Sequence, residues 1–143
     1  MRTRAMGDYL RFKSALPPRL SEFVILMTSR EWTQQYEWNV HYPIALAAGI
    51  NPETLKAIAD GRRPEKMTED EEILYDFCTE LLQNQSVSDA TYARALAKFG
   101  EPGVVEAASL EGYYTFLSMV MNTARTALPE GAKPQLAAFP ANH

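Results

Sequence analysis

The residue types best suited to acid–base chemistry in this chain are concentrated in residues 35–49, QYEWNVHYPIALAAG. This stretch contains Glu37 and His41, and a separation of four residues places two side chains on one face of a helix, one turn apart. A carboxylate beside an imidazole raises the pKa of the ring and orients it, as in a general acid or base. The same spacing is also typical of structural or solvated pairs, so spacing leaves both interpretations open.

Two further features favour a functional pair. The aromatic residues Trp38 and Tyr42 flank it, and a polar pair among aromatic rings lies in a drier setting where pKa values shift. Glu22 precedes the apolar run FVILM in an earlier predicted helix, and a buried acid requires a partner. We therefore expect Glu22 to join Glu37 and His41. The alternative is that Glu22 only complements the helix dipole in a first turn.

The elements that must position these residues are all helical. Patterns of period 3.6 recur along the chain, whereas alternating runs of strand length are absent from the sequence. A short helix is predicted over residues 4–13, Pro18 begins the central helix, and Gly49 ends the helix of His41. Pro43 is expected to bend or loosen the turn around His41. Further helices are predicted after the capping residues Asn51, Thr68 and Ser88, with Gly100 ending one helix and Pro102 opening the last.

Length and composition predict a single helical domain over residues 1–143, with an irregular tail over 130–143. The net charge of −4 provides no basic surface for nucleic acid, and the apolar run FVILM is too short to cross a membrane. We find no pattern of a secretory signal. Cys78 is the single cysteine, which excludes an internal disulfide and fits a reducing cytoplasm, so we expect a cytoplasmic protein.

Four of these residues carry a resemblance to a known family. Glu22, Gln34, Glu37 and His41 have the spacing Glu-x11-Gln-x2-Glu-x3-His, which resembles the carboxymuconolactone decarboxylase and alkyl hydroperoxidase D-like superfamily. The similarity covers residues 16–129. It implies an all-α fold, an orthogonal multi-helix bundle of the alkyl hydroperoxidase D-like type, and homo-oligomers, frequently trimers or hexamers.

The chain departs from the peroxidase branch of that superfamily, which has Glu-x11-Cys-x2-Cys-x3-His. Gln34 and Glu37 stand at the two cysteine positions, and neither can act as the attacking or resolving thiol. Thiol peroxidase activity is therefore not expected. The decarboxylase branch, with a pattern close to Glu-x3-His-x3-Ala-x3-Gly, is more similar to Glu37, His41, Ala45 and Gly49.

The leading hypothesis is a decarboxylase-like lyase that needs no cofactor and no metal and acts on a small carboxylated or lactone-type molecule. His41 would be the general acid or base, Glu37 and Glu22 would complete a proton relay, and Trp38, Tyr42 and Gln34 would line the substrate site. A substrate carboxylate would also need a cation, for which Arg19, Arg30 or an arginine of a neighbouring subunit are the candidates. The alternative is an oligomeric module that binds a ligand or partner without catalysis. A third hypothesis is a metal site formed by the two acids and the imidazole.

Overall fold

The computed structural model describes residues 4–6, 8 and 15–138, and every regular element in that part of the chain is a helix. The prediction of an all-α fold is confirmed. Residues 4–6 and 8 are helical, and the rest of the helix predicted over 4–13 lies outside the described residues. The helices are α2 (Pro18–Glu31), α3 (Gln35–Ala47), α4 (Pro52–Ala59), α5 (Glu69–Asn84) and α6 (Asp89–Ala124).

The helix ends follow the capping signals in the sequence. Pro18 occupies the first turn of α2, where its missing N–H leaves no hydrogen bond unmade. Asn51 caps α4 by accepting a hydrogen bond from the Glu53 N–H at 2.9 Å. Gly49 follows α3 with φ 104°, a left-handed conformation that side chains disfavour. The boundaries of the predicted helices are therefore encoded locally.

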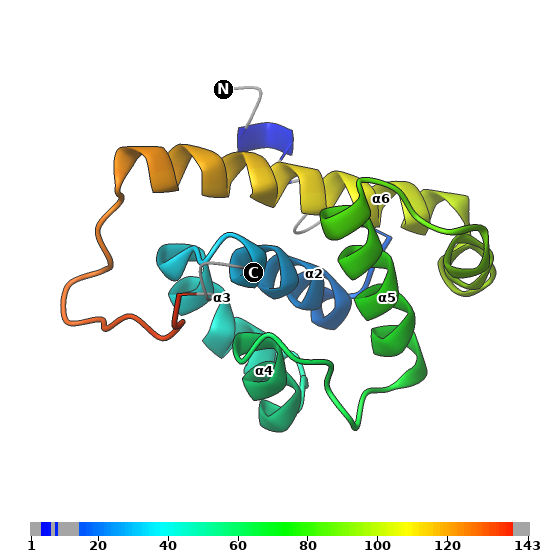
Figure 1. Cartoon of the computed structure of the whole chain (residues 1–143), viewed down its shortest axis with the longest axis horizontal. Helices are drawn as coiled ribbons and strands as arrows, with labels where there is room; N and C mark the ends of the chain where they lie inside the picture. The colour runs from blue at the N-terminus through cyan, green and yellow to red at the C-terminus, as the bar shows by residue number, and fades with distance from the viewer. Residues whose placement is uncertain (1–3, 7, 9–14, 139–143) are drawn as a thin grey trace.

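Helix α6 consists of two helical segments that meet at Gly100. Gly100 has φ 70° and ψ 172°, which is not helical, and Pro102 lies just beyond it. Figure 1 shows the first segment nearly end-on and the second running along the length of the molecule. After the break, a Cβ placed on Gly103 would lie 2.6 Å from the Phe99 Cβ, so the backbone approaches Phe99 closely. The predicted break between two helices is confirmed.

Helix α2 is the centre of the molecule. Every residue from Leu20 to Arg30 is buried, and α2 contacts α3, α4, α5 and α6. In Figure 1 it lies beneath α6, with α3 and α5 on either side. This position carries polar side chains such as Glu22 into the interior together with the apolar ones, and there they need partners.

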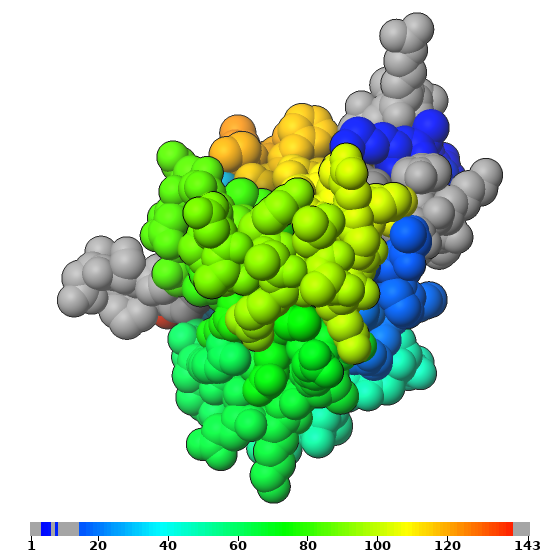
Figure 2. All heavy atoms as spheres, turned by 90° about the vertical axis from the view of Figure 1, so that its right-hand side faces the viewer, coloured from blue at the N-terminus to red at the C-terminus, as the bar shows by residue number. Residues whose placement is uncertain are grey.

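Helix α5 and the first segment of α6 form one end of the molecule, which Figure 2 shows facing the viewer. Polar contacts join them. Arg94 Nη1 lies 2.8 Å from Asp76 Oδ2, and the Thr91 hydroxyl donates to Glu80 Oε1 at 2.6 Å. These contacts connect α5 to the first segment of α6, before the break at Gly100.

The described part of the tail packs on its own chain. Leu136 is buried, and its backbone C=O accepts from Gln35 Nε2 at 2.6 Å while its N–H donates to Gln35 Oε1 at 3.0 Å. The Ala137 carbonyl accepts from Arg30 Nη2 at 2.8 Å. The tail is irregular, as predicted, and side-chain hydrogen bonds hold its described residues against α2 and α3.

Among the described residues, no helix combines the length and the apolar character that crossing a membrane would require.

Candidate acid–base site

Two adjacent helices supply the candidate site. Glu22 lies in the second turn of α2, while Glu37 and His41 lie one turn apart in α3. Gln34 is the N-cap of α3, and its Oε1 accepts a hydrogen bond from the Glu37 N–H at 2.9 Å. This cap fixes the first turn of α3 and with it the backbone position of Glu37.

The imidazole of His41 lies between two carboxylates. Its Nδ1 is 2.6 Å from Glu22 Oε2, and its Nε2 is 3.2 Å from Glu37 Oε2. The side chain of His41 is 3% exposed, and those of Glu22 and Glu37 are 9% and 10% exposed. The structure thus brings together the three residues that the sequence predicted as a relay, in a nearly dry environment.

This geometry constrains where protons reside. A neutral imidazole donates one hydrogen bond only, whereas two ionised carboxylates both need a donor. Burial by itself lowers the pKa of His41, but the hydrogen bonds to Glu22 and Glu37 and their negative charges raise it above the ordinary value. The charged imidazolium is therefore the form that satisfies both acids.

Tyr114 of α6 completes the surroundings of the ring and was missed in the sequence. Its hydroxyl lies 3.4 Å from His41 Nε2, and the two rings meet edge to face at 5.3 Å with an interplanar angle of 90°. Tyr114 belongs to the run GYYTFLSMVM of α6. Its separation from His41 by 73 residues leaves no local signal for the contact.

The three residues predicted to line the substrate site occupy different environments. Trp38 is 1% exposed and belongs to the hydrophobic core, and its ring lies 6.0 Å from that of the half-buried Tyr42. Gln34 is buried beside Glu37, and its Nε2 donates to Asn122 Oδ1 of α6 at 3.1 Å. No pattern in the sequence points to Asn122, although this residue links α6 to the N-cap of α3.

The two candidate arginines for a substrate carboxylate are engaged elsewhere. Arg19 binds Asp70 Oδ2 at 2.6 Å and Glu71 Oε2 at 2.8 Å, both on α5. Arg30 donates to the carbonyls of Ala59 and Ala137 and to the Thr33 hydroxyl. Any substrate carboxylate at the relay would need a different cationic partner.

Cys78 lies in the core, and burial raises the pKa of its thiol well above the usual range, which disfavours the reactive thiolate. In the part of the chain that the structure describes, no three side chains of His, Cys, Asp or Glu are arranged to hold a metal ion. Both ring nitrogens of His41 already face carboxylates.

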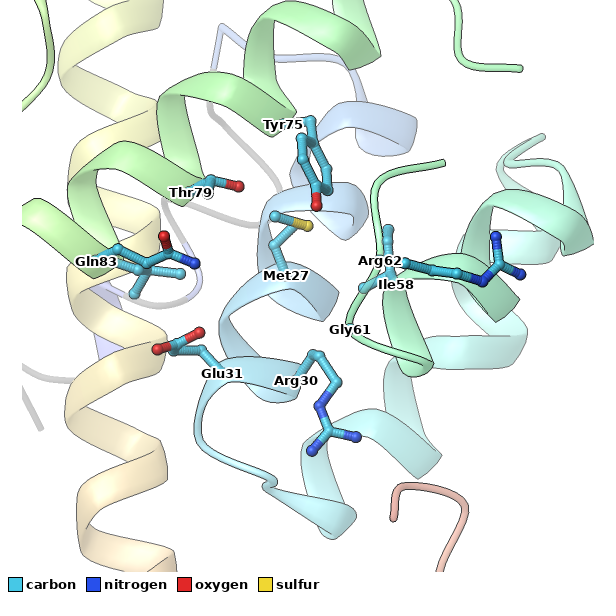
Figure 3. Close-up of a pocket in the computed structure, with 10 residues that line it drawn as sticks. Met27, Arg30, Glu31, Ile58, Gly61, Arg62, Tyr75, Thr79 and Gln83 are labelled. Atoms are coloured by element: carbon cyan, nitrogen blue, oxygen red, sulfur yellow. The ribbon is translucent and has the colours of Figure 1, made fainter. Parts of the chain in front are cut away.

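Two cavities near the end of α2 are separate from the relay. One of about 60 Å³ lies between Met27, Ile58 and Tyr75, and Figure 3 shows Arg30 and Glu31 pointing to different sides of α2 beside it. A second, of about 640 Å³, lies between the end of α2, α5 and α6. Neither is lined by Glu22, Glu37 or His41. The first is too small for a substrate, whereas the second has the size of a ligand site.

The fold and site define an all-helical protein with a buried carboxylate–imidazole–carboxylate cluster. No family model matches the chain, and no curated protein matches it. Among solved structures, it is similar to a crystal structure from Agrobacterium tumefaciens, described as a protein of unknown function and candidate antioxidant defence protein AhpD. The two share 14% identity over 90% of this chain and 88% of the other, with a TM-score of 0.71. The chain therefore has the AhpD-like helical fold.

Proposed function

We propose that this protein is a cofactor-free enzyme, similar to carboxymuconolactone decarboxylases, that uses Glu22, His41 and Glu37 as a proton relay. The observation that carries the proposal is the placement of both His41 ring nitrogens against buried carboxylates, at 2.6 Å and 3.2 Å. Buried acid–base clusters with shifted pKa values are concentrated at functional sites. The substrate class is a small lactone or carboxylated molecule.

The reaction would break the bond to a carboxylate, release carbon dioxide and leave the electron pair delocalised into an unsaturated lactone carbonyl. His41 would then deliver a proton to the resulting dienolate carbon. Nδ1 has the shorter contact, to Glu22, so the Nε2 proton beside Glu37 is the more available one. Glu22 would hold the ring orientation and stabilise the imidazolium. The proton consumed in each turnover would come from water, with Glu37 taking it up and passing it to Nε2.

A non-catalytic oligomeric module with the same fold remains a second candidate, because α6 exposes apolar side chains on one side. Phe116, Met119 and Val120 are each about half exposed and follow helical i, i+3, i+4 spacing. Such a stripe is typical of an association surface. Light scattering coupled to size-exclusion chromatography, with Phe116→Glu as the disrupting variant, measures the assembly that both candidates share.

Turnover separates the two candidates. Unsaturated γ-lactone acids are incubated with the wild type and with His41→Ala, and carbon dioxide release is followed. The catalytic proposal expects loss of most of the rate in His41→Ala, since a positioned general acid contributes roughly 100-fold to 10,000-fold. Glu53→Gln, an exposed acid on α4, is the matched control and should retain the rate.

Equal rates in wild type and His41→Ala would remove His41 from the mechanism. A folded, assembled wild type that turns over none of these acids would favour the non-catalytic module.

A further inference from the structure

The ring nitrogen Nε2 of His41 has two polar neighbours. Glu37 Oε2 lies 3.2 Å from it, and the hydroxyl of Tyr114, a residue that is 2% exposed, lies 3.4 Å from it. Among the described residues, the titratable groups in contact with the ring are Glu22 of α2, Glu37 of α3 and Tyr114 of α6. Ionised carboxylates only accept hydrogen bonds, whereas the tyrosine hydroxyl both donates and accepts.

The Nδ1 side of the ring decides which neutral form His41 takes once Nε2 has lost its proton. Nδ1 lies 2.6 Å from Glu22 Oε2. Two lone pairs at that separation would repel, so a proton lies between these two atoms in the neutral ring as well as in the imidazolium. The neutral ring therefore carries its proton on Nδ1, and Nε2 becomes a hydrogen-bond acceptor.

An unprotonated Nε2 needs a donor, and the ionised Glu37 cannot supply one. A buried acceptor without a donor is costly, because it has lost its hydrogen bond to water. The Tyr114 hydroxyl can turn its proton towards Nε2 and meet this need. In the imidazolium, by contrast, the charged Glu37 is the nearer and stronger acceptor, so Tyr114 contributes less to that form.

We propose that Tyr114 is a positioning residue of the relay, whose hydroxyl donates to His41 Nε2 once the ring has given up its proton. The hydrogen bond stabilises the neutral ring with its proton on Nδ1, and this makes the Nε2 proton easier to release. The inference rests on the proposed function for the step in which Nε2 delivers a proton to substrate, but the hydrogen bond itself can be tested without substrate.

Tyr114→Phe is the first test, because it removes the hydroxyl and keeps the ring that meets the imidazole edge to face. An NMR titration of the ring nitrogens should give a His41 pKa that is higher by about 0.5–1 in this variant, since its neutral ring lacks a hydrogen bond. Tyr92→Phe changes an exposed tyrosine of the same helix and should leave that pKa unchanged. A His41 pKa that is unchanged or lowered in Tyr114→Phe would overturn the proposal.

The tautomer of the neutral ring is a second test, and it needs only the wild type. At a pH above the pKa of His41, the chemical shifts of the ring nitrogens should identify the form with its proton on Nδ1. A neutral ring protonated on Nε2 would equally refute the proposal, because the Tyr114 hydroxyl could then only accept.

Turnover provides a third test, which separates this inference from the proposed function. Where lactone acids are turned over, the fall of kcat/KM at alkaline pH should move upwards in Tyr114→Phe by as much as the pKa of His41 does. A fall at the same pH as in the wild type would exclude Tyr114 from the proton-transfer step. A wild type without turnover would count against the proposed function, while the pKa and the tautomer would still decide whether Tyr114 donates to Nε2.

Discussion

His41 Nδ1 lies 2.6 Å from Glu22 Oε2, although 19 residues and a helix boundary separate the two side chains. The contact joins the central helix α2 to α3 through charge rather than apolar packing. Both side chains are more than nine-tenths buried, so water screens the interaction weakly. The protonation of His41 is consequently coupled to the stability of the fold as well as to any reaction at the ring.

The first prediction concerns the titration of His41. Its pKa should lie above the usual value near 6.5. Burial lowers the pKa of the ring, but the hydrogen bonds and negative charges of Glu22 and Glu37 together raise it by more. Glu22→Gln should lower that pKa, since the hydrogen bond and the charge of Glu22 raise it. The ring chemical shifts, followed by NMR as pH changes, measure both values, with Glu53→Gln as a control. A ring that titrates near 6.5 in both wild type and Glu22→Gln would contradict the relay geometry.

The second prediction follows from the same raised pKa. A histidine with a raised folded-state pKa adds stability that is complete below its unfolded pKa and is lost as pH rises through the folded pKa. Glu22→Gln removes one partner of a buried pair and should lower the free energy of unfolding by about 3 kcal/mol at pH 6. The difference should shrink towards pH 9, when the ring is neutral in both proteins. Urea denaturation at the two pH values measures it, and a difference independent of pH would show that the ring carries no charge in this pair.

The third prediction concerns Glu111. Because its folded pKa is raised to about 8, the folded state holds a proton that the unfolded state releases near pH 4.5, and stability falls between these values as pH rises. Glu111→Gln removes this penalty. The variant should therefore melt at a higher temperature than wild type at pH 8.5, with little difference at pH 4.5, as scanning calorimetry can show. Stabilisation of equal size at both pH values would mean that ionisation of the Glu111 carboxyl does not destabilise the folded wild type.

The fourth prediction uses two glycines of α6 as a matched pair. A Cβ at Gly103 would meet Phe99 at 2.6 Å, whereas a Cβ at Gly112 would meet nothing within 4 Å. Gly103→Ala should destabilise the protein by about 1–3 kcal/mol through overpacking. Gly112→Ala should stabilise it by up to about 1 kcal/mol, because alanine is the better helix former. Chemical denaturation measures the change in the free energy of unfolding, which should be negative for Gly103→Ala and positive for Gly112→Ala. Changes of the same sign and size would contradict the close packing of Gly103 on Phe99.

The fifth prediction tests how α3 is anchored. Gln34 both caps α3 and donates to Asn122, so Gln34→Ala should lower the free energy of unfolding by about 1–2 kcal/mol. Asn122→Ala removes one of these two interactions and a hydrogen bond to the Trp32 carbonyl. A double-mutant cycle should show coupling between the two residues. Strictly additive effects would mean that the Gln34–Asn122 contact contributes nothing.

The sequence by itself determined the helical class, the helix boundaries and the pairing of Glu37 with His41. These features depend on neighbours a few residues apart: Pro18 and Asn51 act within one turn, Gly100 breaks a helix at its own position, and i, i+4 spacing is a property of any helix. Glu22 was predicted as a partner from its place before FVILM and from the resemblance, but its distance from the ring could not be deduced.

Only the tertiary structure decided the contacts that cross helices. Tyr114 reaches His41 over 73 residues, Asn122 reaches Gln34 over 88, and the tail binds Gln35 over about 100. The burial of the Glu111 carboxyl had no sequence signal either, because an acid in a long helix is ordinarily solvated. The crossing of α2 with α3 and α6 fixes which side chains share the interior, and local propensities carry no information about that packing.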